Sequence, residues 1–248
     1  MLRLWDDRAG SYARLAARPS VPLRVCVHGP AARPGPSHLR ALLVADVLTR
    51  VAELRGGQVI TVLAADGPPD ETLGRDISAL GIHPPAARTS PGEIAAVLGG
   101  PAHVHVAWAG PGDHRDGLLL DVGPVEGEAA GPAGNGPDPL ALRLALLSRS
   151  YRQPVTLTRA VLADAAGVLD QWRARVAGWA GEPSRPIPPD IAGKIRDAFD
   201  DDLDTAAALA LLREVESDPG MPAGAKFETF VFVDRVLGLE LPREIGRR

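Results

Sequence analysis

Residues 25–48, VCVHGPAARPGPSHLRALLVADVL, contain the pattern that decides the fold. The short apolar and β-branched run at 23–27 predicts a buried strand. A loop rich in Gly and Pro follows it. Apolar residues then recur at spacings of three and four from Pro36 or Ser37 to about Leu54, which predicts a helix with a buried face.

A second buried strand is predicted at residues 58–64, QVITVLA. A helix between two apolar strands makes a βαβ unit, so the two strands are expected to be parallel, with a right-handed crossover between them. Two short helices at 70–80 and 91–98 and a strand at 103–108 continue the same pattern. The first part of the chain is therefore predicted to be an α/β domain with a parallel sheet.

The character of the sequence changes at Pro139. Residues 109–138 are rich in Gly, Pro, Ala and acidic side chains, and they predict a long flexible linker. We therefore expect a Rossmann-like α/β domain over residues 1–138 and a helical bundle over residues 139–248. The helices predicted in the second part are 139–150, 158–180, 189–216 and one near 224–237.

The composition excludes several classes of protein. Hydrophobic residues make up 45% of the 248 residues, which is enough for a sizeable core. The net charge of −4 argues against strong non-specific binding of nucleic acid. The single cysteine, Cys26, excludes an intramolecular disulfide. The sequence has no apolar signal core at its start and no uninterrupted apolar run approaching about 18 residues, so a soluble cytoplasmic protein without a membrane span is expected.

The strand, loop and helix start at 25–48 form a candidate phosphate site. Free backbone N–H groups and the dipole at a helix N-terminus favour anions. The residues placed there are Gly29 and Gly35 in the loop and Ser37, His38 and Arg40 in the first helical turn. This arrangement is neither a G-x-G-x-x-G fingerprint nor a P-loop, so these residues alone also fit an ordinary turn of a doubly wound fold.

The same stretch resembles the N-terminal half of bacterial cysteinyl-tRNA synthetases, which are class I aminoacyl-tRNA synthetases. That family reads "CGPTV…PHIGHVRS…FDVLRR" where this chain reads HGPAARPGPSHLRALLVADVLTR, residues 28–50. From His38 to Leu48 the match has no gap. Downstream, residues 76–98, DISALGIHPPAARTSPGEIAAVL, resemble the family's "ALG…PP…PRAT.HI" passage.

The helical half carries the same resemblance. Residues 138–158, DPLALRLALLSRSYRQPVTLT, are similar to the family's "DPEALRYFLLSAHYRSPLDFS". Residues 200–212, DDDLDTAAALALL, are similar to "MDDDFNTPEALAVL". The resemblance covers most of 1–98 and 138–216 with a heavily abbreviated segment between them. It implies a truncated class I synthetase-like protein, with a Rossmann-like nucleotide-binding domain followed by a helical bundle.

The chain departs from the family at the motifs that carry its chemistry. The HIGH motif, which contacts ATP phosphates in the family, aligns with residues 35–38, so only its second histidine remains, as His38. The resemblance makes His38 the one predicted catalytic residue. Ser37 stands where a glycine usually lets the backbone approach ATP closely.

The second family motif, KMSKS, is lost. Its lysines neutralise charge in the transition state at phosphorus. Its expected place, residues 127–135, reads GEAAGPAGN, and the first lysine of the chain is Lys194. Arg33, Arg40 and Arg115 are the candidates that could stand in for these cations.

The amino-acid pocket of the family contains a zinc ion, and the resemblance places His28 at its first ligand. Cys26 lies two residues earlier, on the same face of the predicted strand. His103, His105 and His114 are further histidines that could join them, and 103 and 105 share a strand face. Scattered surface histidines are the simpler interpretation. We therefore assign His28 and Cys26 to the amino-acid pocket and predict no metal site and no zinc.

Other polar and aromatic residues receive weaker assignments. Asp66 follows the second strand, where a carboxylate could contact a ribose or an ammonium group, or cap a loop. The acidic run at 200–202 is expected to start a helix rather than bind a metal. Trp172 and Trp179 lie seven residues apart on a helix, and we expect them to pack in the core.

Two functional hypotheses follow, and the sequence leaves open whether the chain is an enzyme. The first is a cysteinyl-tRNA synthetase paralogue, a pseudoenzyme that does not charge tRNA. It would retain binding of ATP, another nucleotide or an aminoacyl-adenylate, or would bind an unidentified protein partner. The second is an ATP-dependent ligase that joins a cysteine-like amino acid to a small amine.

Overall fold

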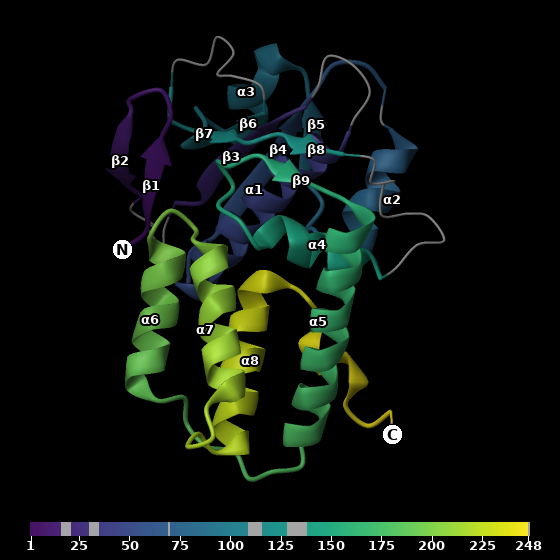
Figure 1. Ribbon diagram of the computed structural model, residues 1–248. Helices are drawn as coiled ribbons and strands as arrows, with labels where there is room; N and C mark the ends of the chain where they lie inside the picture. Colours follow the sequence, from purple (N-terminus) through teal and green to yellow (C-terminus); the bar gives the residue numbers. More distant parts are fainter. Residues whose placement is uncertain (16–20, 30–34, 69, 109–115, 128–137, 248) are drawn as a thin grey trace.

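A five-stranded sheet is the centre of the α/β half in the computed structural model, with strand order β5-β4-β3-β6-β7 (Figure 1). Every neighbouring pair of these strands is parallel. In chain order this is 3-2-1-4-5, the order of a Rossmann-type sheet, and the predicted fold class is confirmed. The strands are β3 (Leu23–His28), β4 (Val59–Ala64), β5 (Ala87–Thr89), β6 (Val104–Trp108) and β7 (Leu118–Val122).

The structure describes residues 1–15, 21–29, 35–68, 70–108, 116–127 and 138–247. Two small strand pairs lie outside the central sheet. β1 (Arg3–Asp6) and β2 (Ser11–Arg14) form an antiparallel hairpin beside β7. β8 (Val125–Glu126) and β9 (Val155–Thr156) pair in parallel and join the α/β half to the start of the helical half.

Helices cover both faces of the sheet (Figure 1). α1 (Pro36–Leu54) packs on one face, and its residues from 37 to 49 are all buried because it lies between the sheet and the helical half. α2 (Glu71–Ala79) lies beside α1. The short η1 (Pro91–Glu93) and α3 (Ile94–Leu98) cover the other face.

The helical half forms a bundle on the side of α1 that faces away from the sheet (Figure 1). Trp172 is 1% exposed, and its ring meets Phe230 edge to face, as does Trp179, so the predicted packing of both tryptophans is confirmed. The elements of this half are α4 (Pro139–Leu147), α5 (Arg159–Trp179), α6 (Pro189–Asp200), α7 (Thr205–Ser217), α8 (Ala223–Leu237) and η2 (Leu241–Glu244). None of the described helices is both long and apolar enough to cross a bilayer.

Two expected elements differ from the structure. The helix predicted over 189–216 is two helices, because Asp202 and Leu203 adopt left-handed backbone conformations with φ of 56° and 55°. The Asp202 carboxylate there accepts hydrogen bonds from Trp5 N and Tyr151 Oη, and Asp204 caps α7. The linker predicted over 109–138 contains strands β7 and β8, while 109–115 and 128–137 lie outside the described residues.

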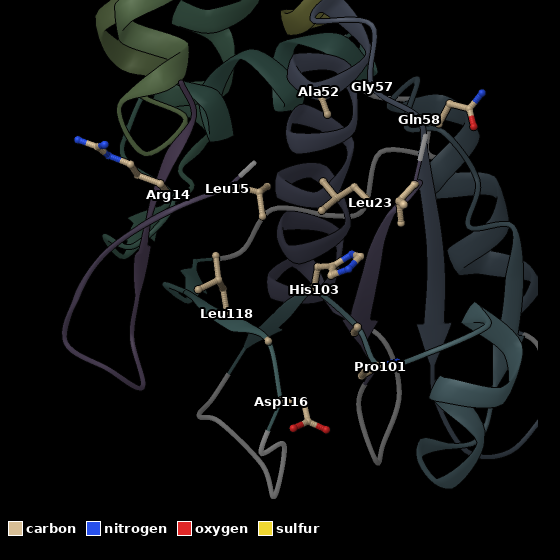
Figure 2. A pocket seen from close by; sticks show the side chains of 13 residues that line it. Arg14, Leu15, Leu23, Ala52, Gly57, Gln58, Pro101, His103, Asp116 and Leu118 are labelled. Atoms are coloured by element: carbon tan, nitrogen blue, oxygen red, sulfur yellow. The ribbon is translucent and has the colours of Figure 1, made fainter. Parts of the chain in front are cut away.

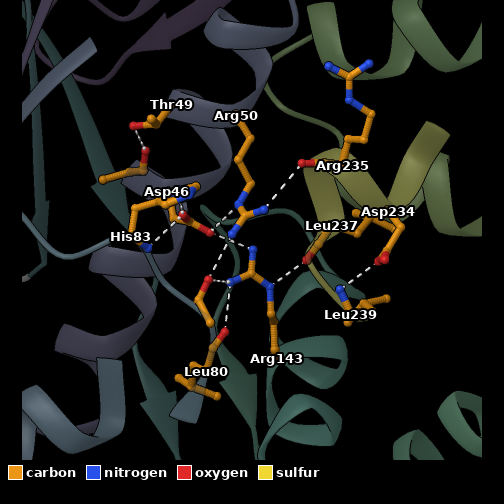
Figure 3. A network of polar contacts seen from close by, with 12 residues as sticks. Asp46, Thr49, Arg50, Leu80, His83, Arg143, Asp234, Arg235, Leu237 and Leu239 are labelled. Carbon is orange, nitrogen blue, oxygen red and sulfur yellow. Dashed lines mark hydrogen bonds and ion pairs between the residues drawn. The ribbon is translucent and has the colours of Figure 1, made fainter. Parts of the chain in front are cut away.

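A buried ionic network joins α1 to the helical half (Figure 3). Asp46 of α1 and Arg143 of α4 both have fully buried side chains, and Arg143 Nη2 donates to Asp46 Oδ2 at 2.6 Å. The Arg143 guanidinium also donates to the carbonyls of Leu80 and Leu237, and Arg50 donates to Asp46. Burial works against the charged Asp46, but Arg143 and Arg50 outweigh it and hold the pKa of the Asp46 carboxyl below its usual value.

One continuous cluster of buried apolar side chains runs from the α1 face of the sheet through α4 into the bundle. The division of the chain at residue 138 therefore stays a prediction.

Candidate functional site

The strand order reverses between β3 and β6, because β4 and β5 lie to one side of β3, whereas β6 and β7 lie to the other. In open α/β sheets, ligands bind beyond the carboxyl ends of the strands at such a point. His28 ends β3, Trp108 ends β6, and α1 begins nearby with Gly35 as its N-cap. We call these residues, together with Ser37 and His38, the switch-point site.

Gly29 is required where the chain leaves β3. A Cβ added at Gly29 would lie 2.6 Å from the Cβ of Ala65, which follows β4, so a larger residue would force the strand ends apart. The Gly29 N–H donates to the carbonyl of Ala64 at 2.7 Å. The structure therefore places Gly29 at the expected edge, with its N–H bonded within the sheet.

The start of α1 lies at the switch point, where the dipole of the helix favours an anion. The N-cap residue, Gly35, has no side chain with which to cap the helix, and Pro36 occupies the first turn. Among the described residues, which exclude 30–34, no atom lies within 4 Å of a Cβ built on Gly35. The N–H groups of His38 and Leu39 bond back to the carbonyl of Gly35.

The side chains of Ser37 and Arg40 form hydrogen bonds with backbone groups of the protein. Ser37 Oγ accepts a hydrogen bond from Val125 N of β8 at 2.9 Å. Arg40 is 1% exposed, and its guanidinium donates to the carbonyls of Gly123, Ser150 and Gln153. These bonds tie the first turns of α1 to the connections around β8 and β9, so nucleotide contact by either side chain stays a prediction.

His38 lies at the beginning of α1 against the last residue of β6. It is 5% exposed, and its ring meets the Trp108 ring edge to face at 5.2 Å. Burial lowers the pKa of His38 to about 4, so the imidazole is neutral at physiological pH. A neutral imidazole can donate or accept one hydrogen bond to a ligand, but it cannot neutralise phosphate charge.

The lowered pKa of His38 predicts a loss of stability in mild acid. The unfolded histidine titrates near 6.5 and the folded one near 4, so the unfolded state binds more protons between these values and stability falls as the pH drops through them. Between pH 7 and pH 5, the free energy of unfolding of the wild type should fall by about 2 kcal/mol more than that of His38→Gln. Urea unfolding at both pH values measures this difference, and equal losses in the two proteins would contradict it.

Asp66 is exposed just after β4, at the same edge of the sheet. Its carbonyl, together with that of Gly67, accepts hydrogen bonds from Arg88 of β5. Arg88 is not among the residues predicted from the sequence for this site. Arg33, Arg115 and residues 128–135 of the expected KMSKS position lie outside the described residues.

Three metal-ligating side chains meet on the α3 face of the sheet. Cys26 of β3 is paired in register with His105 of β6, and His28 lies two residues beyond Cys26 on the same face. One potential ligand atom from each residue lies within 4.8 Å of the other two. His28 Nε2 and His105 Nδ1 are 2.9 Å apart, and Cys26 is fully buried. The chain thus brings together a cysteine and two histidines where the sequence analysis predicted no metal.

The other histidines considered for this cluster lie elsewhere. His103 accepts a hydrogen bond from the backbone N–H of Arg24 and contacts its guanidinium. His114 is outside the described residues. Without a metal, burial raises the pKa of the Cys26 thiol to about 12, so the cysteine is a protonated thiol at neutral pH.

A hollow of about 640 Å³ lies at the opposite edge of the sheet, where the strands begin (Figure 2). Its volume would suit a small ligand. However, Leu23, His103 and Leu118 line it at the amino ends of their strands, away from the switch point. Its lining residues Leu15, Val21 and Asp116 adjoin, in the sequence, segments that lie outside the described residues, so we assign the hollow no role.

Curated proteins with similar sequences are cysteine ligases. The L-cysteine:1D-myo-inositol 2-amino-2-deoxy-alpha-D-glucopyranoside ligase of Streptomyces griseus is 40% identical over 110 residues, which are 43% of this chain and 26% of that protein. Proteins of the same name from Thermobifida fusca and Rhodococcus jostii are each 38% identical, over 44% of this chain and 26% of their own length. The match therefore spans about a quarter of these relatives. No known protein-family profile matches the chain.

Proposed function

We propose that this chain binds a nucleotide or an aminoacyl-adenylate at the switch-point site and does not charge tRNA. The observation that carries the proposal is the N-terminus of α1 at the reversal of the strand order, with neutral His38 beside Trp108. The helix dipole favours a phosphate there, and His38 supplies a hydrogen bond. Trp108 is 36% exposed and offers an apolar ring to a base or side chain.

The side chains around this site support binding more than catalysis. Ser37 and Arg40 are engaged with protein carbonyl and amide groups. The chain has no lysine before Lys194. Transfer at phosphorus depends on cations aimed at the developing charge, so their loss is expected to cost orders of magnitude in rate.

The second candidate is an ATP-dependent ligase that joins the carboxyl group of a cysteine-like amino acid to a small amine. The names of the cysteine ligases that share about 40% identity favour it. In this reaction the carboxylate would attack the α-phosphate of ATP with loss of pyrophosphate. The amine would then attack the acyl-adenylate with loss of AMP.

One pair of measurements separates the two candidates. Thermal shift measures binding of ATP and of a non-hydrolysable cysteinyl-adenylate analogue. ATP–pyrophosphate exchange with each amino acid, cysteine first, measures adenylate formation. A thermal shift without exchange supports the binding protein, exchange above background supports the ligase, and the absence of both overturns both proposals.

Replacing His38 by alanine should weaken binding of the adenylate analogue by about tenfold or more, because a hydrogen bond to a charged group contributes roughly 1.5–3 kcal/mol. The change in affinity is measured by titration calorimetry. His83→Ala is the matched control, since His83 follows α2 and pairs with Asp46 away from the switch point. Equal affinities for the His38 variant and the wild type would remove His38 from the site.

A further inference from the structure

A second hollow, of about 180 Å³, lies between the later turns of α1, the start of β4 and the turn that precedes β5. We call it the α1–β4 hollow. Asp46, Thr49 and Glu53 line it from α1, and their spacings of three and four place them on one face of the helix. Thr61 lines it from β4, and His83 lines it from the turn before β5. The hollow therefore gathers polar side chains from three separate parts of the chain.

The carboxylate of Asp46 fixes the proton of the His83 ring (Figure 3). His83 Nδ1 lies 2.8 Å from Asp46 Oδ1, and the backbone N–H of His83 donates to the same oxygen. Because a carboxylate accepts hydrogen bonds, Nδ1 carries the proton, and Nε2 of the neutral ring is left with a lone pair. Within the described part of the chain, no group donates to this Nε2. His83 therefore offers an unused acceptor, and its side chain is 55% exposed.

Glu53 supplies a second acceptor to the hollow. It follows Asp46 by about two turns of α1 and is exposed. Its carboxylate has no ion-pair or hydrogen-bond partner among the residues that the structure describes. Thr49 Oγ1 donates to the carbonyl of Ala45, so the lone pairs of this oxygen are also left as acceptors. Neither lysine nor arginine is among the described lining residues, so the hollow presents acceptors and a negative charge.

We propose that the α1–β4 hollow binds a small primary ammonium ion, whose N–H groups donate to His83 Nε2 and to the Glu53 carboxylate. The volume equals that of roughly six water molecules in the liquid, which suits a ligand of a few heavy atoms. The alkyl part of the ligand would pack on the rings of Pro84 and Pro85, which form part of the wall. His83, Asp46 and Glu53 are not among the described groups of three side chains close enough to hold a metal ion, which favours an ammonium ion over a metal.

The α1–β4 hollow is separate from the switch-point site. It lies at the start of β4 and beside the later turns of α1, whereas the switch-point site lies at the start of α1 and the end of β3. Ser37 and Glu53 are about 24 Å apart along the helix axis, at about 1.5 Å per residue. The two sites can therefore be tested independently, and the ammonium proposal does not rest on nucleotide binding.

The test uses n-propylammonium as the probe and the intact chain with ¹⁵N-labelled histidine. In the free protein, long-range ¹H–¹⁵N spectra should show His83 with its proton on Nδ1. Near pH 8, where an alkylammonium is charged, the probe should shift the Nε2 signal saturably with a Kd of about 1 mM. Tetramethylammonium has the same charge but no N–H group, so it should bind at least about tenfold more weakly. A proton on Nε2, no saturable shift, or equal binding of the two ions would overturn the proposal.

Variants at two exposed positions assign the contacts, with affinities taken from backbone amide shifts and folding checked by circular dichroism. His83→Ala should weaken binding by about tenfold, because it removes a hydrogen bond to a charged group. Glu53→Gln should weaken it by about threefold, since it removes the charge of an exposed ion pair and keeps the shape. Glu214→Gln is the matched control, because Glu214 is an exposed residue of α7 and does not line the hollow. Wild-type affinity in His83→Ala or in Glu53→Gln would contradict the proposal.

Discussion

Replacing Arg143 by methionine should lower the free energy of unfolding by about 3–5 kcal/mol, the usual result of breaking a buried ion pair. The substitution would leave the fully buried carboxylate of Asp46 without its closest cation. It would also remove the donors to the carbonyls of Leu80 and Leu237. Urea unfolding followed by circular dichroism measures the loss.

Arg175→Met is the matched control, because the Arg175 side chain is 61% exposed and its one ion pair among the described residues is a long one of 3.7 Å with Glu216. It should change stability by less than about 1 kcal/mol. The double variant Asp46→Asn/Arg143→Met should be more stable than Arg143→Met alone, since no charge is then left buried. A loss in Arg143→Met that is no larger than in the control would show that the network contributes little.

Replacing Arg40 by methionine should destabilise the protein by about 3 kcal/mol and leave nucleotide affinity unchanged. Three carbonyl groups, those of Gly123, Ser150 and Gln153, would lose their charged donor. Gly123 is buried, and an unsatisfied buried group costs roughly 1–3 kcal/mol. Burial lowers the pKa of Arg40 to about 10, so the guanidinium is still charged at neutral pH. The expected result separates a structural arginine from one that binds phosphate.

Urea unfolding measures the change in stability. Calorimetric titration with the adenylate analogue, at a temperature where the variant is folded, measures the affinity. Arg88→Met is the control at the same edge, because Arg88 bonds to the exposed turn after β4. If Arg40→Met kept its stability but lost at least tenfold in affinity, Arg40 would be a nucleotide ligand as the sequence analysis predicted.

The main elements of the fold could be predicted from local patterns. The strand at 23–27, the helix from 36 to 54 and the strand at 58–64 agree with β3, α1 and β4 within one residue at each end. These elements have long apolar runs and clear Gly or Pro ends. β5 and β7 were missed because each is short, and Leu118–Val122 lies in a stretch dominated by Gly and acidic residues.

The site was less predictable because it depends on long-range pairing. Alternation placed His103 and His105 on one strand face, but only the parallel register puts His105 beside Cys26 and leaves His103 with Arg24. Nothing in the sequence around Trp108 indicates its contact with His38. That contact depends on how α1 packs across β6. Arg40 has the charge and position of a phosphate ligand in the sequence, and only the fold shows the carbonyl groups that surround its guanidinium.

The burial of α1 on all sides bears on how this architecture can be inherited. Residues 37–49 of the helix are covered by the sheet on one side and by the helical half on the other. If the α/β half were produced alone, the buried side chains of Leu43, Val47 and Val51 would form an exposed apolar patch that favours aggregation. Exchanging one half without the other is expected to leave part of this apolar surface uncovered, so we expect the two halves to be inherited together.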